Sequence, residues 1–448
     1  MNVLLISANT VTSPYPVYPL GLDYVAAALL PHHRVRIADM NSMDLNALAE
    51  LMDEFRPHVV GISLRNIDNT DVTLPQGYVE GYGELVRIVR LHTGAPIVLG
   101  GAGYSIFPER LLSALGADYG IVGEGEQMAA LVASIESRQS TDCLPGIIKA
   151  NQHLCPPVPL KTIPPPLLDS EQKHLSFYLR NGGMLNLQTK RGCPFRCIYC
   201  TYPRIEGNRF RFMDPATVGR TAKAIQEAGA KYFFITDSAF NADIDHSLAV
   251  AAQFRKNGVT LPWGAFLAPI KMPAHYFDSL VEAGLSHVEF GTESLSDRVL
   301  KTYDKPFERS NVLWAHGAAV EAGLHVAHYF LFGGPGETPD TLETTLSHID
   351  KLKKSVLFLF CGMRIYPHTV LFEHAVKKGQ INRSQDLMAP VYYQSADIGR
   401  ERIIERLKAK ANNRINWVIG SGGDETGELL RRMYGKGYSG PLWEFLIR

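Results

Sequence analysis

The chain has 448 residues, of which 46% are hydrophobic and 20% are charged. This composition excludes a disordered chain and a collagen-like repeat, and the length predicts two or three globular domains. Its 45 basic and 45 acidic residues balance. A nucleic-acid-binding protein usually carries a basic excess, so no nucleic-acid partner is expected.

The first ten residues, MNVLLISANT, are predicted to form a strand. They lack the basic region and the small-residue cleavage site of a signal peptide. No 18 consecutive apolar residues without a charge occur, so no membrane span is expected. The six cysteines are few and unevenly placed, which favours a reducing cytoplasm over a secreted disulfide framework.

Residues 1–135 alternate short apolar runs with helical patterns, which predicts a doubly wound α/β domain with a parallel sheet covered on both faces. Such a sheet binds ligands outside the carboxyl ends of its strands. The expected strands are 3–8, 35–39, 59–64, 97–101 and 119–123, and the expected helices are 20–30, 45–55, 83–92 and 109–115.

Small residues and glycines follow four of these strands. A glycine lets a ligand approach the backbone closely, and we expect a side chain at Gly101 to fill space that a ligand needs. A tight turn explains any single glycine equally well, but four such ends at one edge favour a large flat ligand. No G-x-G-x-x-G follows the first strand, which disfavours a dinucleotide site. The candidate ligand-binding residues at this edge are Ser7, Ser63, Leu64, Arg65, Asn66, Gly100, Gly101, Gly123 and Glu124.

Residues 136–183 lose this periodicity and contain proline runs at 156–159 and 164–166. Such runs are typical of a semi-rigid connector. We therefore expect a first domain over residues 1–150 and a linker over 151–183. A second domain is expected over residues 184–380, followed by a mainly helical cap over 381–448 that carries no recognisable motif.

Three cysteines lie close together after an expected strand at 185–189. Cys193, Cys197 and Cys200 form C-x3-C-x2-C. Cysteine thiolates are the usual ligands of a [4Fe–4S] cluster, and no fourth cysteine lies nearby, so one iron would remain open to another ligand. A zinc site and chance clustering are the alternatives. Structural zinc takes four ligands, commonly in two separated pairs, and no second pair follows.

At these residues the sequence resembles the radical S-adenosylmethionine (SAM) superfamily, whose signature is C-x3-C-x2-C with an aromatic residue, here Tyr199, before the last cysteine. The resemblance implies that the open iron binds SAM and that Tyr199 lies beside its adenine. It also implies an open (β/α)6 partial barrel. Strand-like runs at 185–189, 232–236, 263–267, 287–291, 326–332 and 358–366 agree with it, with helical patterns at 217–228, 247–256, 274–283, 312–322 and 341–352 between them.

The resemblance places further SAM contacts at the carboxyl ends of the barrel strands. The second strand ends in Asp237 and Ser238, where the family usually has a Gly-Gly-Glu-like turn. The resemblance therefore does not identify the residue that binds the SAM amino group. For Glu293 and Arg364 a buried ion pair within the barrel is the alternative. The predicted SAM-binding residues are Tyr199, Asp237, Ser238, Glu293, Gly333, Gly334 and Arg364.

A doubly wound domain fused ahead of such a barrel resembles the cobalamin-binding branch of the superfamily. Residues 18–22, Tyr-Pro-Leu-Gly-Leu, resemble the first-loop signature of the branch, which places Leu20 in the cobalamin site. A sheet of this kind can equally hold a flavin or serve only in packing; the fusion favours cobalamin. No D-x-H-x-x-G motif is present, so the lower cobalt face is expected to lack a histidine.

Arg65 is the residue we expect beneath the cobalt instead. It follows the third strand, at the edge where the ligand should lie. A salt bridge from Arg65 to Asp68 or Asp71 is the alternative explanation.

The resemblance therefore implies an enzyme that holds a [4Fe–4S] cluster, SAM and cobalamin. It would transfer a methyl group from methylcobalamin to an unactivated carbon of a small-molecule or lipid-type substrate. One alternative is a cyclase or rearrangement enzyme in which cobalamin carries an electron. Another is a non-catalytic cobalamin or redox sensor, although the C-terminal region shows no output module. A reducing partner such as flavodoxin or ferredoxin is expected.

Overall fold

The computed structural model describes residues 1–150, 152–168, 173–420 and 423–447. Positions 151 and 169–172 of the expected linker lie outside the described residues. The chain divides into two compact units. The first comprises Met1–Asn69, Gly77–Asn181 and Arg204–Gly207, and the second comprises Thr70–Gln76, Gly182–Pro203 and Asn208–Arg448.

The first unit is built on a six-stranded sheet in the order β2-β1-β3-β4-β5-β6. The five predicted strands are confirmed and run parallel, but β6 pairs antiparallel with β5. The prediction of a wholly parallel sheet is wrong at this edge, because the short β6 gives no periodic signal. The strands are β1 Asn2–Ser7, β2 Arg34–Asp39, β3 Val59–Ser63, β4 Ile97–Gly100, β5 Tyr119–Ile121 and β6 Ile147–Lys149.

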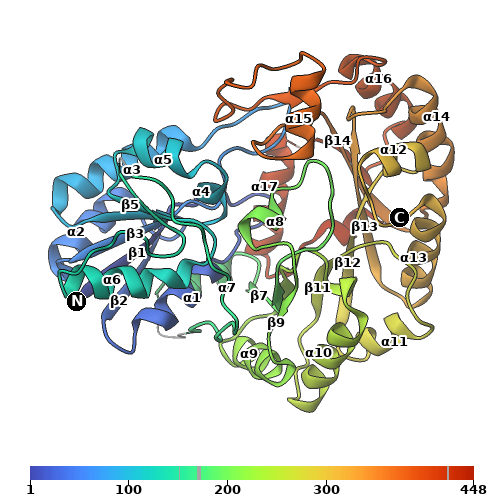
Figure 1. Ribbon diagram of the computed structural model, residues 1–448. Coiled ribbons are helices and arrows are strands. Elements are labelled where there is room, and N and C mark those ends of the chain that lie inside the picture. Colours follow the sequence, from blue (N-terminus) through green and yellow to red (C-terminus); the bar gives the residue numbers. More distant parts are fainter. Residues whose placement is uncertain (151, 169–172, 421–422, 448) are drawn as a thin grey trace. The chain divides into compact units, whose positions relative to one another are not determined.

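Helices cover both faces of this sheet (Figure 1). On one face, α1 and α6 pack on a core that includes Val3, Leu5 and Val59. On the other face, α3 lies between α2 and α5 and contacts both. The helices are α1 Leu20–Leu29, α2 Leu45–Phe55, α3 Val79–His92, α4 Ala102–Ile106, α5 Pro108–Leu115, α6 Met128–Glu136 and α7 Lys173–Arg180, the last within the expected linker.

The strand order places a switch point between β1 and β3. The chain leaves β1 for β2 on one side and returns to β3 on the other, and ligands of doubly wound sheets bind at such a point. Ser7 and Ser63, the last residues of β1 and β3, are register partners. The topology therefore brings the predicted ligand-binding residues to the edge that favours a ligand.

Gly101, between β4 and α4, is required by the packing of the chain itself. Its φ is 98°, and a Cβ there would lie 2.7 Å from the carbonyl oxygen of Leu64 and 3.0 Å from Ser63 Oγ. The same Leu64 oxygen accepts a hydrogen bond from the Gly103 amide, at 2.9 Å. A side chain at Gly101 would therefore meet the loop after β3 first, and the expectation that it would also fill ligand space stays a prediction.

Gly101→Ala should destabilise the protein by about 2 kcal/mol or more, because an L residue at this φ is strained and its Cβ meets backbone. The thermal unfolding temperature of the full chain measures the effect. Gly21→Ala is the control, since Gly21 is a residue of α1 with no atom within 4 Å of its Cβ position. An unchanged unfolding temperature for Gly101→Ala would contradict the packing argument.

The second unit is built on a seven-stranded parallel sheet in the order β17-β14-β13-β12-β11-β10-β7. Strands occur at all six predicted positions, and β17 adds a seventh from the C-terminal region, which was expected to be mainly helical. The strands are β7 Met184–Leu187, β10 Tyr232–Ile235, β11 Trp263–Leu267, β12 Leu285–Glu293, β13 His325–Phe332, β14 Ser355–Cys361 and β17 Trp417–Ile419.

The strand predicted over 358–366 is divided into two. Gly362, with a φ of 91°, ends β14 and turns the chain. The following β15 (Met363–Arg364) pairs antiparallel with β16 (Tyr392–Tyr393) in a separate small sheet. Another short pair, β8 (Lys190–Arg191) and β9 (Arg211–Phe212), flanks the segment with the three cysteines. Arg364 is therefore beyond the barrel strand to which the sequence assigned it.

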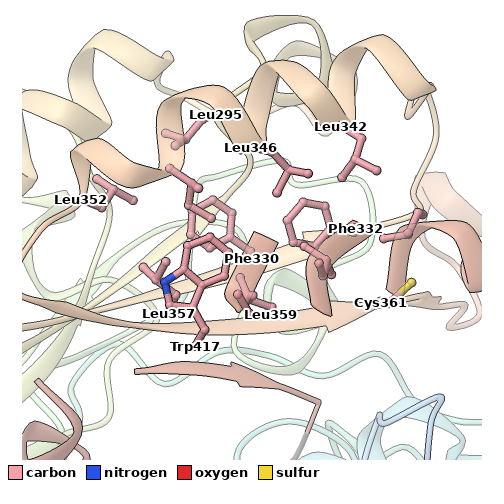
Figure 2. Packing of buried hydrophobic residues seen from close by; sticks show 14 of the residues in the cluster. Leu295, Phe330, Phe332, Leu342, Leu346, Leu352, Leu357, Leu359, Cys361 and Trp417 are labelled. Atoms are coloured by element: carbon pink, nitrogen blue, oxygen red, sulfur yellow. The ribbon is translucent and has the colours of Figure 1, made fainter. Parts of the chain in front are cut away.

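The core of the second unit lies between its sheet and the helices outside it. Figure 2 shows Phe330 and Phe332 of β13 and Leu357 of β14 packed beneath Leu342 and Leu346 of the helix above. The outer helices are α9 Pro215–Glu227, α10 Ile244–Lys256, α11 Tyr276–Val281, α12 Asp297–Thr302, α13 Arg309–Glu321 and α14 Pro339–His348, and the remaining helices are α8 Tyr202–Ile205, α15 Val370–Lys377, α16 Arg400–Ala411 and α17 Gly423–Gly435.

Alternate strand residues point to the opposite face of this sheet, away from the outer helices. There, both oxygens of the buried Glu289 carboxylate accept hydrogen bonds, from Tyr329 Oη at 2.8 Å and from Trp443 Nε1 at 3.0 Å. Trp443 begins the short 3-10 helix Trp443–Leu446, so the end of the chain packs on this face. No helix in the described part of the chain is long and apolar enough to span a membrane.

Candidate cofactor-binding and active site

The three-cysteine loop lies beyond the carboxyl end of β7 and is held from both sides. Cys193 is buried, Cys197 and Cys200 are partly buried, and all three are free thiols. The Ile198 amide within the loop donates to the carbonyl of Tyr303 at 3.2 Å, and its carbonyl accepts from the Leu371 amide at 2.8 Å. Segments far away in the sequence therefore fix the loop backbone.

The chemistry of this loop fits an iron–sulfur cluster, in which each thiolate binds its own iron. Burial raises the pKa of Cys197, and it raises that of Cys200 to about 12. Bound iron would favour the thiolate forms that ligate it, because metal binding releases the protons of its ligands. Among the described residues no group of three or more His, Cys, Asp or Glu is arranged to hold a single metal ion.

Lys305 joins this loop to the end of β12, and the sequence did not predict it. Its Nζ lies 3.0 Å from both Tyr199 Oη and Glu293 Oε1, and 3.6 Å from Cys197 Sγ. Tyr199 Oη in turn donates to Glu293 Oε1 at 2.6 Å. Burial lowers the pKa of Lys305, but the charges of Glu293, Tyr199 and Cys197 outweigh that effect and raise it well above its usual value.

Glu293 has a strained backbone at the centre of this network. Its φ is 61°, and the register between β12 and β13 shifts between Gly291 and Glu293. A non-glycine residue in this conformation costs about 1–3 kcal/mol and is typical of functional sites. The buried ion pair that the sequence left open for Glu293 is observed, with Lys305 as its partner; the predicted SAM contact of Glu293 stays a prediction.

Asp237 follows β10 and forms a buried ion pair. Its Oδ2 accepts from Lys190 Nζ at 2.9 Å and from Thr189 Oγ1 at 2.5 Å, while Oδ1 accepts from the Thr189 amide at 2.8 Å. Ser238 Oγ donates to the carbonyl of Gly192, beside Cys193, at 3.3 Å. Asp237 thus holds the strand that leads to the cysteine loop, and the SAM contacts of Asp237 and Ser238 stay predictions.

The glycine-rich segment after β13 and Arg364 also have observed structural roles. A Cβ at Gly334 would lie 2.4 Å from Tyr303 Oη, whereas Gly333 lines a small pocket together with Cys361. The Arg364 guanidinium donates to the carbonyls of Ile365 and Leu387, at 2.7 and 2.6 Å. Gly333 is therefore the more open of the two glycines, and the SAM contacts of all three residues stay predictions.

Glu337, in the same glycine-rich segment, should make stability depend on pH. Burial raises its pKa from 4.5 to about 7, and its Oε2 has no hydrogen-bond partner among the described residues. A carboxyl group with a raised folded-state pKa costs stability as the pH rises from the unfolded pKa to the folded one. Relative to Glu337→Gln, the natural protein should lose about 3 kcal/mol between pH 4.5 and 7.

The difference in unfolding temperature between Glu337→Gln and the natural protein, followed from pH 4.5 to 8, measures this loss. The exposed Glu321→Gln on α13 is the matched control. A constant difference between Glu337→Gln and the natural protein over this range would contradict the assignment.

In the first unit the predicted cobalamin residues lie at one edge of the sheet. At the ends of β1 and β2, Ser7 and Tyr178 both hydrogen-bond to Asp39, with Tyr178 Oη 2.8 Å from Asp39 Oδ2. The carbonyl of Asn66 accepts from Tyr82 Oη at 2.6 Å, and the Gly123 amide donates to Ser105 Oγ at 3.1 Å. Leu20 begins α1, which follows β1; Leu64, Gly100, Gly101 and Glu124 lie next to the ends of β3, β4 and β5.

Arg65 stands exposed at this edge, after β3. Four tyrosines at positions 15, 78, 82 and 178 are close enough to influence its charge. The placement of Arg65 beneath the cobalt stays a prediction, and a salt bridge to Asp68 or Asp71 stays the alternative. Its position after β3, beside the switch point, is one where doubly wound sheets bind ligands.

Comparison with protein families assigns each unit. Residues 6–133 match the B12 binding domain, and residues 187–349 match the Radical SAM superfamily. The tryptophan 2-C-methyltransferase of Streptomyces laurentii is 25% identical, over 82% of this chain and 73% of that protein. The cytidylyl-2-hydroxyethylphosphonate methyltransferase of Streptomyces wedmorensis is 24% identical, over 85% and 82%.

The fold is shared with a solved structure. The radical SAM methyltransferase TsrM from Kitasatospora setae, with cobalamin and a [4Fe–4S] cluster bound, superposes with a TM-score of 0.88 at 22% identity. The match covers 99% of this chain and 97% of that one.

A doubly wound sheet, together with an open barrel that presents three cysteines beyond a strand end, defines a radical SAM protein with a B12-binding domain. The chain thus joins a B12-binding domain to a radical SAM domain, as predicted, and the curated relatives named above are methyltransferases. The two matched families are named for SAM and B12, and the structurally similar TsrM holds cobalamin and a [4Fe–4S] cluster.

Proposed function

We propose that the chain is a methyltransferase that acts on a carbon atom of a small planar molecule bound at the face of the barrel sheet that points away from the outer helices. The observation that carries the proposal is a group of aromatic rings on that face. Phe266 is 37% exposed. Tyr329 stacks on Phe358 with ring centroids 4.9 Å apart, and Phe360 lies parallel to it at 6.4 Å.

A gap in the side chains of this face supports the same proposal. Gly291 of β12 is the register partner of Tyr329, and a Cβ at Gly291 would meet only Glu293 Oε1, at 3.6 Å. Planar molecules stack on aromatic rings, and a glycine leaves room for them beside Glu293. The relative from Streptomyces laurentii methylates tryptophan, a planar aromatic molecule, so tryptophan and indole compounds are the first substrates to test.

The proposal gives the chain's own residues the following roles. When bound, the cofactors supply the electron-transfer and methyl-transfer chemistry. Cys193, Cys197 and Cys200 would hold the cluster, while Glu289 fixes the ring of Tyr329 by accepting a hydrogen bond from its hydroxyl group. A one-electron donor such as flavodoxin or ferredoxin and a cytoplasmic location complete the proposal. The cobalamin contacts are assigned to the carboxyl edge of the first sheet, and the SAM contacts to Tyr199, Asp237, Ser238, Glu293, Gly333, Gly334 and Arg364.

Anaerobic incubation of the reconstituted full chain with methyl-labelled SAM, reductant and tryptophan tests the function. Formation of S-adenosylhomocysteine together with a labelled ring product supports the proposal. 5′-Deoxyadenosine without methylated product would favour the cyclase or rearrangement alternative. Neither product would favour the sensor. Cys197→Ala, which removes one cluster ligand, is the negative control.

A further inference from the structure

The ammonium group of Lys305 is fully engaged in the network around the cysteine loop. A lysine carries three N–H donors and no acceptor, and three acceptors lie around Nζ, namely Tyr199 Oη, Glu293 Oε1 and Cys197 Sγ. Because Tyr199 Oη donates its own proton to Glu293, its lone pairs are available to Lys305. Each of the three donors therefore has one acceptor.

Lys305 is also largely shielded from water. Its side chain is 7% exposed, and that of Glu293 is 11% exposed. The Nζ atom of Lys305 lies 5.4 Å from the ring centre of Tyr199 and 5.6 Å from that of Phe307. A cation in such surroundings is screened much less than one at the surface, so its charge acts strongly on the atoms that it contacts.

We propose that Lys305 is a positioning residue that raises the reduction potential of the cluster bound by Cys193, Cys197 and Cys200. The potentials of iron–sulfur clusters depend on net charge and on hydrogen bonds to the sulfurs. A donor and a positive charge at Cys197 Sγ stabilise the state that holds one more electron. Lys305 thus makes one-electron reduction by an external donor easier. The inference rests on the cluster, not on the identity of the substrate.

The ion pair with Glu293 does not cancel this effect. Removing Lys305 would take a hydrogen bond and a positive charge away from Cys197. It would also leave the Glu293 carboxylate uncompensated close to the cluster. Both changes disfavour the addition of an electron, so they shift the potential in the same direction.

Three variants of the full chain test the proposal. Lys305→Met keeps the length and apolar stem of the side chain but removes the charge, and Lys305→Arg keeps the charge. Lys301→Met, at an exposed position one turn earlier, is the matched control for loss of a surface lysine. After anaerobic reconstitution, the iron content of each variant is measured, and the cluster is titrated with reductant while its paramagnetic resonance signal is followed.

We expect Lys305→Met to bind iron fully but to have a clearly more negative midpoint potential. Lys305→Arg should return the potential towards the natural value, and Lys301→Met should leave it unchanged. An unchanged potential in Lys305→Met would overturn the proposal. Loss of iron in both Lys305 variants would also overturn it, because Lys305 would then only hold the loop. Absence of a cluster from the natural chain would instead contradict the cofactor assignment itself.

Discussion

Replacing Cys193, Cys197 and Cys200 together by alanine should abolish both iron binding and SAM cleavage. The natural chain, reconstituted anaerobically, should hold about four irons. The triple variant should hold almost none, since it lacks the three thiols that would bind the irons. Iron and sulfide analysis measures the first effect, and 5′-deoxyadenosine and S-adenosylhomocysteine formation measures the second.

The other three cysteines provide a matched control. Cys143 and Cys155 lie in the first unit, where their thiols are in contact, and Cys361 is buried in the core of the second unit. Changing these three to alanine removes the same number of thiols without touching the loop, so iron loading should stay near that of the natural chain. Full iron loading in the Cys193, Cys197 and Cys200 variant would refute the cluster assignment.

The two sheets were predictable because their strands are continuous apolar runs separated by amphipathic helices. Each run from 3–8 to 119–123 corresponds to a strand of the first sheet. The strands at one edge of each sheet were not predictable. Strands β6 and β17 have only three residues each, too few for periodicity, and their places depend on pairing with β5 and β14. Gly362 ended β14 early through its backbone conformation, which the apolar pattern does not report.

The candidate site shows the same division between local and long-range signals. The cysteine motif is local, with three ligands within eight positions, so the sequence predicted it directly. Lys305 is more than 100 positions away from Cys197, with no motif around it, and only the fold brings them together. Asp237 stands at a strand end, as a ligand-binding residue would, yet its partner Lys190 could be seen only in the structure.

Arg65 is the residue that we expect to determine the surroundings of the lower cobalt face in cobalamin bound to the first unit. It follows β3 at the switch point, and it is exposed. An arginine remains protonated in proteins and has no lone pair to offer a metal. Beneath the cobalt it would occupy the lower face without ligating it. Its fixed positive charge would also favour an electron-rich cobalt. Cobalt must be electron-rich in order to accept a methyl group.

Arg65→His should therefore introduce a lower ligand, because a neutral imidazole can coordinate cobalt. We expect the visible spectrum of the bound cobalamin to change to that of a histidine-ligated form. Methyl transfer should fall at least about tenfold, which corresponds to ~1.4 kcal/mol of activation free energy, while the iron content stays normal. Arg87→His, at an exposed position on α3 where Arg87 pairs with Glu84, adds a histidine away from the edge and should change neither spectrum nor rate. If Arg65→His leaves the cobalamin spectrum and the rate of methyl transfer unchanged, Arg65 does not lie beneath the cobalt.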